Sequence, residues 1–368
     1  MKTINLSLGE LQNATPDAIV EAGIEALRKG FTHYSPVEGI YNLRLAIANH
    51  YAEQQFDVGP ENVMITPGVR PAVHNILQNL IKPGDEVIVP TPYWFAFPEL
   101  IQLSGGVLVP LETSLDDNYA IDPEKLKKLI TPKTRLFIFN NPCNPSGRIY
   151  TKQEIRDLVT VLEPHPEINI LSDEIYQFIT YDKPIYPFSR EQAITDRLIT
   201  VSGFSKTFSM AGWRVGYIVA SEKFIQLFRR FQEVSLSGIS LFSQYAALKA
   251  FEIKDEYLKT LLETLNNRRK VGLDILSNVE GLRFLEPEGT YYFFPDISSF
   301  FGSQTPDGQV IESSSQLVSV LFKLARIQVR PGFNFGQPAH IRVGFTVDDE
   351  LWREGITRMA ETLSQFRR

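Results

Sequence analysis

Short runs of β-branched and other apolar residues recur along the first 221 positions of the chain. Runs of this length and composition are typical of buried β-strands. They lie at 62–67, 85–90, 106–111, 135–140, 168–173, 197–203 and 215–221. Most of the intervals carry helical patterns, such as PAVHNILQNLI from Pro71 and TKQEIRDLVTVL from Thr151. The alternation predicts an α/β fold, in which a mainly parallel sheet of seven buried strands is flanked by helices on both faces.

The interval before the last of these runs is different. It reads SKTFSMAGWR, which is too short for the dozen or more residues of a crossover helix, so strand 215–221 should be antiparallel to its neighbour. Long helical patterns follow from about 222 to 279, and then strand patterns at 289–296 and 340–345. We therefore predict a large domain over 29–269, which holds the ligand site, and a smaller α+β domain formed by 1–28 and 270–368.

Composition narrows the possible functions. The chain has 368 residues, 43% of them hydrophobic, and a net charge of -6 with dispersed Lys and Arg, so nucleic acid is not an expected partner. The single cysteine, Cys143, excludes an internal disulfide and fits a reducing cytoplasm, and the five histidines lack a metal-binding spacing. No stretch approaches 18 uninterrupted apolar residues, and no basic N-terminal region precedes a long apolar run. We predict a protein with no bound metal that is neither secreted nor membrane-spanning.

Ligands of open α/β sheets bind beyond the carboxyl ends of the strands, and four of the predicted strand ends are unusually polar. These ends are 68–70, 141–147, 173–176 and 202–214. Neither a Gly-x-Gly-x-x-Gly motif after the first strand nor a Walker-type Gly-Lys-Ser/Thr is present, which argues against a dinucleotide or nucleotide site.

Together these segments resemble the class I/II aminotransferases, the pyridoxal-phosphate enzymes with the aspartate aminotransferase fold. The resemblance spans nearly the whole chain, with six motifs in the family's order and approximate spacing. They are HYSPVEGIYNLR (33–44), NNPCNPSG (140–147), SDEIY (172–176), SKTFSMAGWRVGY (205–217), VRPGFNFG (329–336) and HIRVGF (340–345). One such motif is weak evidence, but six in order are strong.

The resemblance implies catalytic roles for three residues. Lys206 would form the Schiff base with pyridoxal 5'-phosphate and move a proton at the substrate carbon; an isolated lysine would instead be a solvated surface residue. Asp173 would pair with the pyridine nitrogen, or else cap a helix that begins near Glu174. Tyr176, on the same helical face, would reach the ring's phenolic oxygen.

Other residues would bind the cofactor. Asn144 would contact the phenolic oxygen from another strand end, with turn formation as the alternative for it and for Asn141. Trp94 would cover the pyridine ring, unless it is an ordinary core aromatic. The phosphate would be bound at the start of a helix by Gly68, Val69 and Arg70, with Ser205, Arg214 and, from a partner subunit, Tyr34. A homodimer with shared active sites would follow, although Tyr34 could also be a core or interface aromatic.

The substrate would be bound by Arg342 through its α-carboxylate, with Gly9 and Asn144 nearby. Arg330 has no assigned role and is interpreted as a solvated charge. Arg70 follows Gly68 where many relatives carry small or hydroxylic residues, and where one aspartate aminotransferase subgroup has a lysine that binds the substrate's distal carboxylate. Arg70 could do the same, or it could pair with the phosphate or an internal acid and leave a pocket for aromatic or aliphatic side chains. Gly203 stands where many relatives have serine.

We therefore expect a ping-pong aminotransferase that moves an amino group from an L-amino acid, preferably aspartate or glutamate, to a 2-oxo acid. The alternatives are an aromatic or methionine-type aminotransferase, β-elimination or oxidation on the same scaffold, and a regulator without turnover. Such a regulator usually carries an added DNA-binding domain, for which we find no N-terminal segment.

Overall fold

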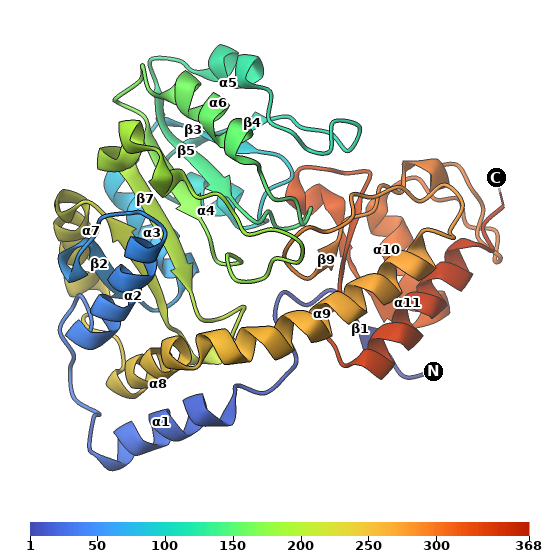
Figure 1. The fold of residues 1–368 in the computed structure, drawn as a ribbon. Coiled ribbons are helices and arrows are strands. Elements are labelled where there is room, and N and C mark those ends of the chain that lie inside the picture. Colours follow the sequence, from blue (N-terminus) through green and yellow to red (C-terminus); the bar gives the residue numbers. More distant parts are fainter. Residues whose placement is uncertain (368) are drawn as a thin grey trace.

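A seven-stranded sheet forms the centre of the larger part of the protein. The computed structural model describes residues 1–367, and Figure 1 shows the sheet enclosed by helices. The strand order is β2-β8-β7-β6-β5-β3-β4. The strands are β2 (Val63–Thr66), β3 (Glu86–Pro90), β4 (Val107–Leu111), β5 (Thr134–Asn140), β6 (Asn169–Asp173), β7 (Leu198–Gly203) and β8 (Gly216–Ala220). All seven coincide with the runs predicted from sequence.

The directions of the strands also agree with the prediction. Neighbours from β4 to β7 are parallel, whereas β8 is antiparallel to both β7 and β2. The prediction that all seven are buried was wrong for β4, where Val107 is 50% exposed. The reason is its place at the edge of the sheet, with β3 on one side only.

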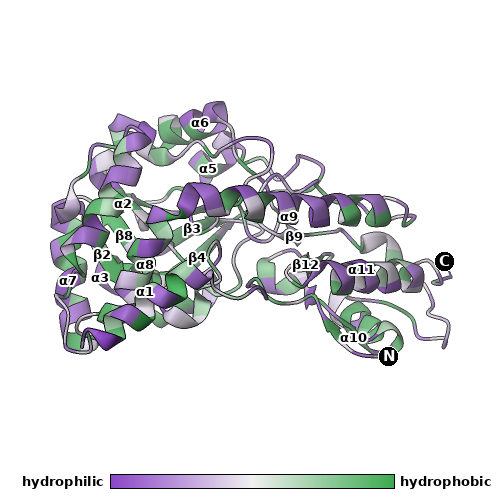
Figure 2. Ribbon diagram, turned by 60° about the horizontal axis from the view of Figure 1, so that its bottom comes forward, coloured by the Kyte–Doolittle hydropathy of each residue, from purple (hydrophilic) through white to green (hydrophobic). Residues whose placement is uncertain are grey.

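Helices cover both faces of this sheet, as the alternation predicts. One face packs against α3 (Val69–Leu80), α4 (Phe97–Leu103) and α7 (Glu222–Ser235). The other packs against α2 (Tyr41–Glu53), α5 (Pro123–Leu129), α6 (Lys152–Leu162) and α8 (Leu241–Glu252). In Figure 2 the strands between these layers are mainly hydrophobic, while the outer helices alternate hydrophobic and hydrophilic positions.

The C-terminal part forms a second, smaller group of elements beside the sheet. The long helix α9 (Lys254–Leu276) leads into it, as Figure 1 shows. Its other elements are β9 (Tyr292–Phe293), α10 (Ser314–Ala325), β10 (Ile327–Gln328), β11 (Arg330–Pro331), β12 (Ile341–Gly344) and α11 (Asp349–Leu363). An antiparallel sheet has the order β11-β12-β9, and the N-terminal strand β1 (Ile4–Asn5) pairs in parallel with β10.

The domain boundaries stay a prediction. The pairing of β1 with β10 supports assigning the N-terminus to the smaller domain. Helix α1 (Asp17–Arg28), however, packs on α8, and its Ile19 belongs to the same apolar cluster as strand residues of the large sheet. We propose that α1 belongs to the larger domain.

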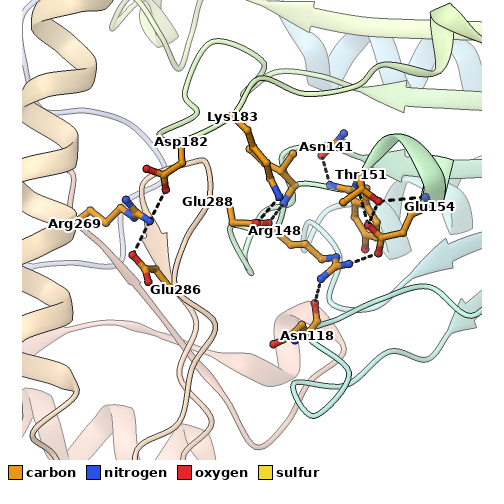
Figure 3. A network of polar contacts seen from close by, with 12 residues as sticks. Asn118, Asn141, Arg148, Thr151, Glu154, Asp182, Lys183, Arg269, Glu286 and Glu288 are labelled. Atoms are coloured by element: carbon orange, nitrogen blue, oxygen red, sulfur yellow. Dashed lines mark hydrogen bonds and ion pairs between the residues drawn. The ribbon is translucent and has the colours of Figure 1, made fainter.

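Polar contacts join the two parts beside the carboxyl ends of the strands (Figure 3). Arg269 of α9 pairs with Asp182 at 3.1 Å and Glu286 at 2.7 Å. The Glu288 carboxylate accepts a hydrogen bond from the Ile149 N–H at 2.8 Å and pairs with Lys183 at 2.6 Å. These contacts hold the segment after α9 against the loops that follow β5 and β6. Within residues 1–367, no helix is both long and apolar enough to cross a membrane.

Candidate active site

A cavity of about 420 Å³ lies where the carboxyl ends of the strands of the large sheet meet the smaller group of elements. It is the place predicted for a ligand of an open α/β sheet. Most of the site residues predicted from sequence line it: Gly9, Val69, Arg70, Trp94, Asn144, Asp173, Tyr176, Ser205, Lys206, Arg214 and Arg342. Segments more than 300 positions apart in the sequence therefore meet in one cavity.

Lys206 lies just after β7 and is not a solvated surface lysine. Its Nζ donates a hydrogen bond to the Gly9 carbonyl at 2.5 Å. Burial and the positive charge of Arg342 lower the pKa of Lys206 to about 8, against the opposing influence of Glu10 and Asp173. A lysine with this pKa is partly neutral near neutral pH, so its amine can act as a nucleophile and exchange protons.

Asp173, at the end of β6, is a buried carboxylate. Burial raises the pKa of Asp173 to about 7, although the Ile175 N–H, which donates to Oδ1 at 3.2 Å, and the charge of Lys206 oppose this. The alternative role as a helix cap was wrong, because residues 175–178 form a turn and no helix begins at Glu174. Among residues 1–367 no basic group forms an ion pair with Asp173, so the carboxylate fits a protonated ring nitrogen in the cavity.

Tyr176 and Asn144 reach the cavity from separate strand ends. We predicted that a helix after Asp173 would direct Tyr176 toward the site. That helix is absent, but the turn after β6 still brings the Tyr176 side chain to the cavity wall. There the hydroxyls of Tyr176 and Tyr292 lie 2.8 Å apart. Asn144 Oδ1 accepts a hydrogen bond from Arg342 at 3.1 Å. Asn141 does not line the cavity; its Oδ1 accepts from the Tyr150 N–H, as the alternative of turn formation implied.

The turn between β2 and α3 suits a phosphate group. Gly68 precedes α3 with φ 101°, and no side chain caps the free N–H groups of the first turn. Arg214 lies against this turn, because it donates hydrogen bonds to the Pro67 carbonyl at 2.9 Å and the Ala211 carbonyl at 2.7 Å. Ser205 lines the same cavity. Uncapped backbone donors beside a fixed guanidinium and a hydroxyl are what a phosphate dianion requires.

Four arginines line the cavity, and none forms an ion pair with an acid of residues 1–367; two of them are Arg342 and Arg70. Arg342 in β12 is 1% exposed, and its Nη2 donates to the Ser7 carbonyl at 2.8 Å. Its Cζ lies 4.2 Å from the Tyr292 ring centroid, and its Nε has no hydrogen-bond partner. Arg70 lies 5.2 Å from the Trp94 ring centroid. Neither forms an ion pair with an acid of the described chain, so Arg70 does not pair with an internal acid. Both guanidiniums are available to carboxylates of a substrate.

Two predicted residues lie outside the wall of the cavity. Gly68 does not line it, but an added Cβ there would lie 2.5 Å from Arg214 Nη2, so it lets the phosphate turn approach that arginine. Tyr34 is 90% exposed, and its role in a partner's site stays a prediction. At Gly203 an added Cβ would lie 2.9 Å from Gly216 Cα, which accounts for the absence of serine.

Sequence reasoning missed several residues of the cavity: Glu10, Phe95, Asn140, Ile175, Ala211, Tyr292 and Arg330. Glu10, Phe95 and Ile175 are immediate neighbours of predicted residues, and this adjacency is the signal that could have found them. Arg330 was interpreted as a solvated charge, and this was wrong, because it is partly buried and faces the cavity. Its proximity to Arg342 depends on strand pairing, which the sequence does not reveal.

Comparison with known proteins connects this geometry to one family. Residues 1–359 match the model for aminotransferase class I and II. The probable aspartate/prephenate aminotransferase of Rickettsia bellii is 35% identical over 97% of this chain and 90% of that protein. Aspartate aminotransferase from Rhizobium meliloti has a TM-score of 0.95 at 29% identity, covering 99% and 92% of the two chains. The Thermus thermophilus aspartate aminotransferase with maleate has a TM-score of 0.91 at 30% identity, covering 98% and 91%.

Proposed function

We propose that this chain, which belongs to the class I and II aminotransferases, takes amino groups from the acidic amino acids aspartate and glutamate and passes them to 2-oxo acids. The protein is an enzyme of the transferase class, and its cofactor is pyridoxal 5'-phosphate. The Asp173 carboxylate and the turn at Gly68 fit the two ends of this cofactor.

Bound pyridoxal phosphate supplies an electron sink for the negative charge that develops at the substrate's α-carbon. Lys206, with its pKa near 8, moves the proton at that carbon and alternates between neutral and charged forms at little cost. Asp173 would keep the ring nitrogen of the bound cofactor protonated, while the N–H groups of α3 and Arg214 would hold its phosphate. Arg342 binds the α-carboxylate through two parallel hydrogen bonds and so orients the α-carbon toward Lys206.

The preference for acidic substrates rests on one observation, the absence of an acidic partner for Arg70 in a cavity that also contains Arg342. A substrate with two carboxylates neutralises both guanidiniums. The names of the most similar relatives also suggest prephenate, a 2-oxo acid with a second carboxylate on its ring, as an acceptor. Prephenate, like aspartate and glutamate, carries two carboxylates.

The test is the absorption spectrum of the purified holoenzyme as aspartate, glutamate, methionine and phenylalanine are added singly without an oxo acid. We expect aspartate and glutamate to bleach the visible cofactor band to the pyridoxamine form. In Arg70→Gln the kcat/KM for these two donors should fall at least about tenfold, which is the loss of one charge-assisted hydrogen bond, with little change for phenylalanine. Arg70→Lys should retain part of the preference.

Other outcomes would favour the alternative functions. Equal losses for acidic and aromatic donors in Arg70→Gln would reject the acidic preference and favour an aromatic or methionine-type enzyme. Release of ammonia with a persistent visible band would indicate elimination or oxidation instead of transamination.

We also propose that the active unit is a homodimer in which Tyr34 reaches the phosphate site of the partner subunit. The 90% exposure of Tyr34 supports this, because an aromatic side chain so exposed on a single chain is available to a second one. A cytoplasmic location stays a prediction, and the buried, unpaired Cys143 is compatible with it.

A further inference from the structure

Arg330 faces the same cavity as Arg342 because of strand pairing. The two residues are directly opposite each other in the antiparallel pair β11–β12. Residues opposite each other in such a pair project from the same face of the sheet, so both guanidiniums reach the cavity, and both line it. A third cation, Arg70, reaches it from the start of α3.

Phe95 lies close to both Arg330 and Arg70. The Arg330 Cζ is 4.8 Å from the Phe95 ring centroid, and the Arg70 Cζ is 5.9 Å from the same centroid. The Nε of Arg330 donates to the Ser7 carbonyl at 3.4 Å, and in residues 1–367 no acid forms an ion pair with this side chain. Both guanidiniums thus lie near the Phe95 ring, and neither is paired with a carboxylate of the described residues.

This concentration of positive charge is unfavourable unless an anion enters. Burial and the charges of Arg342 and Arg70 all lower the pKa of Arg330, against the influence of Tyr292, yet an arginine remains charged. Glu10 and Asp173 are the acids among the residues that line the cavity, and Asp173 has its own place beside Lys206. A substrate with a single carboxylate would occupy Arg342 and leave the other two arginines uncompensated.

We propose that Arg330 is a specificity-determining residue, which together with Arg70 binds the second carboxylate of a dicarboxylic substrate beside Phe95. The inference rests on the proposed function, since it names a second residue for the same substrate class. Two guanidiniums can satisfy both oxygens of one carboxylate, so the preference for dicarboxylates should exceed what Arg70 alone provides.

The experiment is calorimetric titration of the holoenzyme with succinate, a dicarboxylate without an amino group, and with butyrate, a four-carbon monocarboxylate. In Arg330→Gln the Kd for succinate should rise at least about tenfold, while the Kd for butyrate stays within about twofold. Arg330→Lys, which keeps the charge and a similar length, should give an intermediate Kd for succinate. Arg353→Gln removes an exposed arginine of α11 away from the cavity and should change neither Kd.

The outcomes separate this role from others. Equal weakening of succinate and butyrate would show that Arg330 acts only by positioning Arg342 across the strand pair, and unchanged Kd values would show no contact with substrate. Either result overturns the proposal. A wild-type protein that transaminates but binds succinate no tighter than butyrate would overturn this inference alone, whereas a wild-type cofactor band unaffected by any amino acid would overturn the proposed function.

If Arg330→Gln fails to retain the cofactor band or the wild-type unfolding midpoint, Arg330→Lys decides the question through the same two titrations. A Kd for succinate in Arg330→Lys equal to that of the wild type would then count against bidentate binding by Arg330.

Discussion

At the scale of single residues, the site contains an acid and a base whose pKa values have moved toward each other. Burial raises the pKa of Asp173 to about 7, and burial with the charge of Arg342 lowers the pKa of Lys206 to about 8. Both groups can therefore change protonation state near neutral pH, which is the usual property of residues that transfer protons in catalysis.

The lowered pKa of Lys206 predicts a gain in stability when this lysine is replaced. The unfolded chain keeps its proton up to about pH 10.5, the ordinary value for lysine, whereas the folded chain releases it near pH 8. Folding therefore releases a proton between these values, so the free energy of unfolding rises with pH through this window. Cofactor-free Lys206→Met should be more stable than cofactor-free wild type at pH 7, by up to about 3 kcal/mol.

Denaturant unfolding at pH 7, 8.5 and 10 measures this difference. The advantage of Lys206→Met should shrink as the pH rises above 8, and Lys259→Met, which replaces an exposed lysine of α9, should show no such trend. If the difference in unfolding free energy between Lys206→Met and the wild type does not depend on pH, the charge of Lys206 does not cause that difference.

Most single residues of the site could be predicted because their motifs are local. Lys206, Asp173 and Arg342 each lie within a short recognisable string next to a strand end. Arg330 was missed because its role depends on the register that places it opposite Arg342, and register follows from packing rather than from neighbours in sequence.

At the scale of elements, the approach of β8 to the phosphate turn depends on Gly216. A Cβ at this position would lie 2.8 Å from the Gly68 carbonyl carbon and 3.0 Å from the Val69 nitrogen, both backbone atoms that cannot move independently. Gly216→Ala should therefore displace the turn, reduce the affinity for pyridoxal phosphate, and cost about 1–3 kcal/mol of stability, as overpacking does.

Gly212→Ala is the matched control, since an added Cβ there meets no atom within 4 Å. Thermal unfolding and cofactor titration of the two variants provide the comparison. If Gly216→Ala binds the cofactor as tightly as Gly212→Ala, the close contact with the turn is not required.

The strands were predictable because their apolar runs are short and regularly spaced, and the antiparallel β8 followed from an interval too short for a crossover. The helix expected after Asp173 was wrong, because an Asp side chain that accepts from the N–H two residues on stabilises a turn equally well. The exposure of β4 depends on the order of strands in the sheet, which apolar runs do not specify.

At the scale of the whole molecule, an apolar hollow of about 780 Å³ lies beside Arg214. Trp213, Leu236 and Phe242 contribute to its wall, and Leu236 is 54% exposed. An exposed apolar surface next to the phosphate site is consistent with a second subunit that covers it.

Tyr34→Phe tests whether that subunit completes the site. The variant should remain dimeric by light scattering, but its Kd for pyridoxal phosphate should rise roughly tenfold, because one hydrogen bond to a charged group is lost. Tyr41→Phe, which removes the hydroxyl of another exposed tyrosine, should leave this Kd unchanged. A wild-type monomer with full cofactor affinity and turnover would contradict a shared site.

The Gly9 carbonyl accepts hydrogen bonds from Lys206 and from Tyr291, while Ser7 accepts one from Arg342. The N-terminal segment and β12 therefore meet in the wall of one pocket. During synthesis on the ribosome, the strand that pairs with β1 and the arginine for the α-carboxylate emerge only after all seven strands of the large sheet. A partly made chain that stops before β10 can assemble much of the large sheet, but it has no complete place for an amino acid, so the enzyme acquires its substrate pocket after the sheet that supports it.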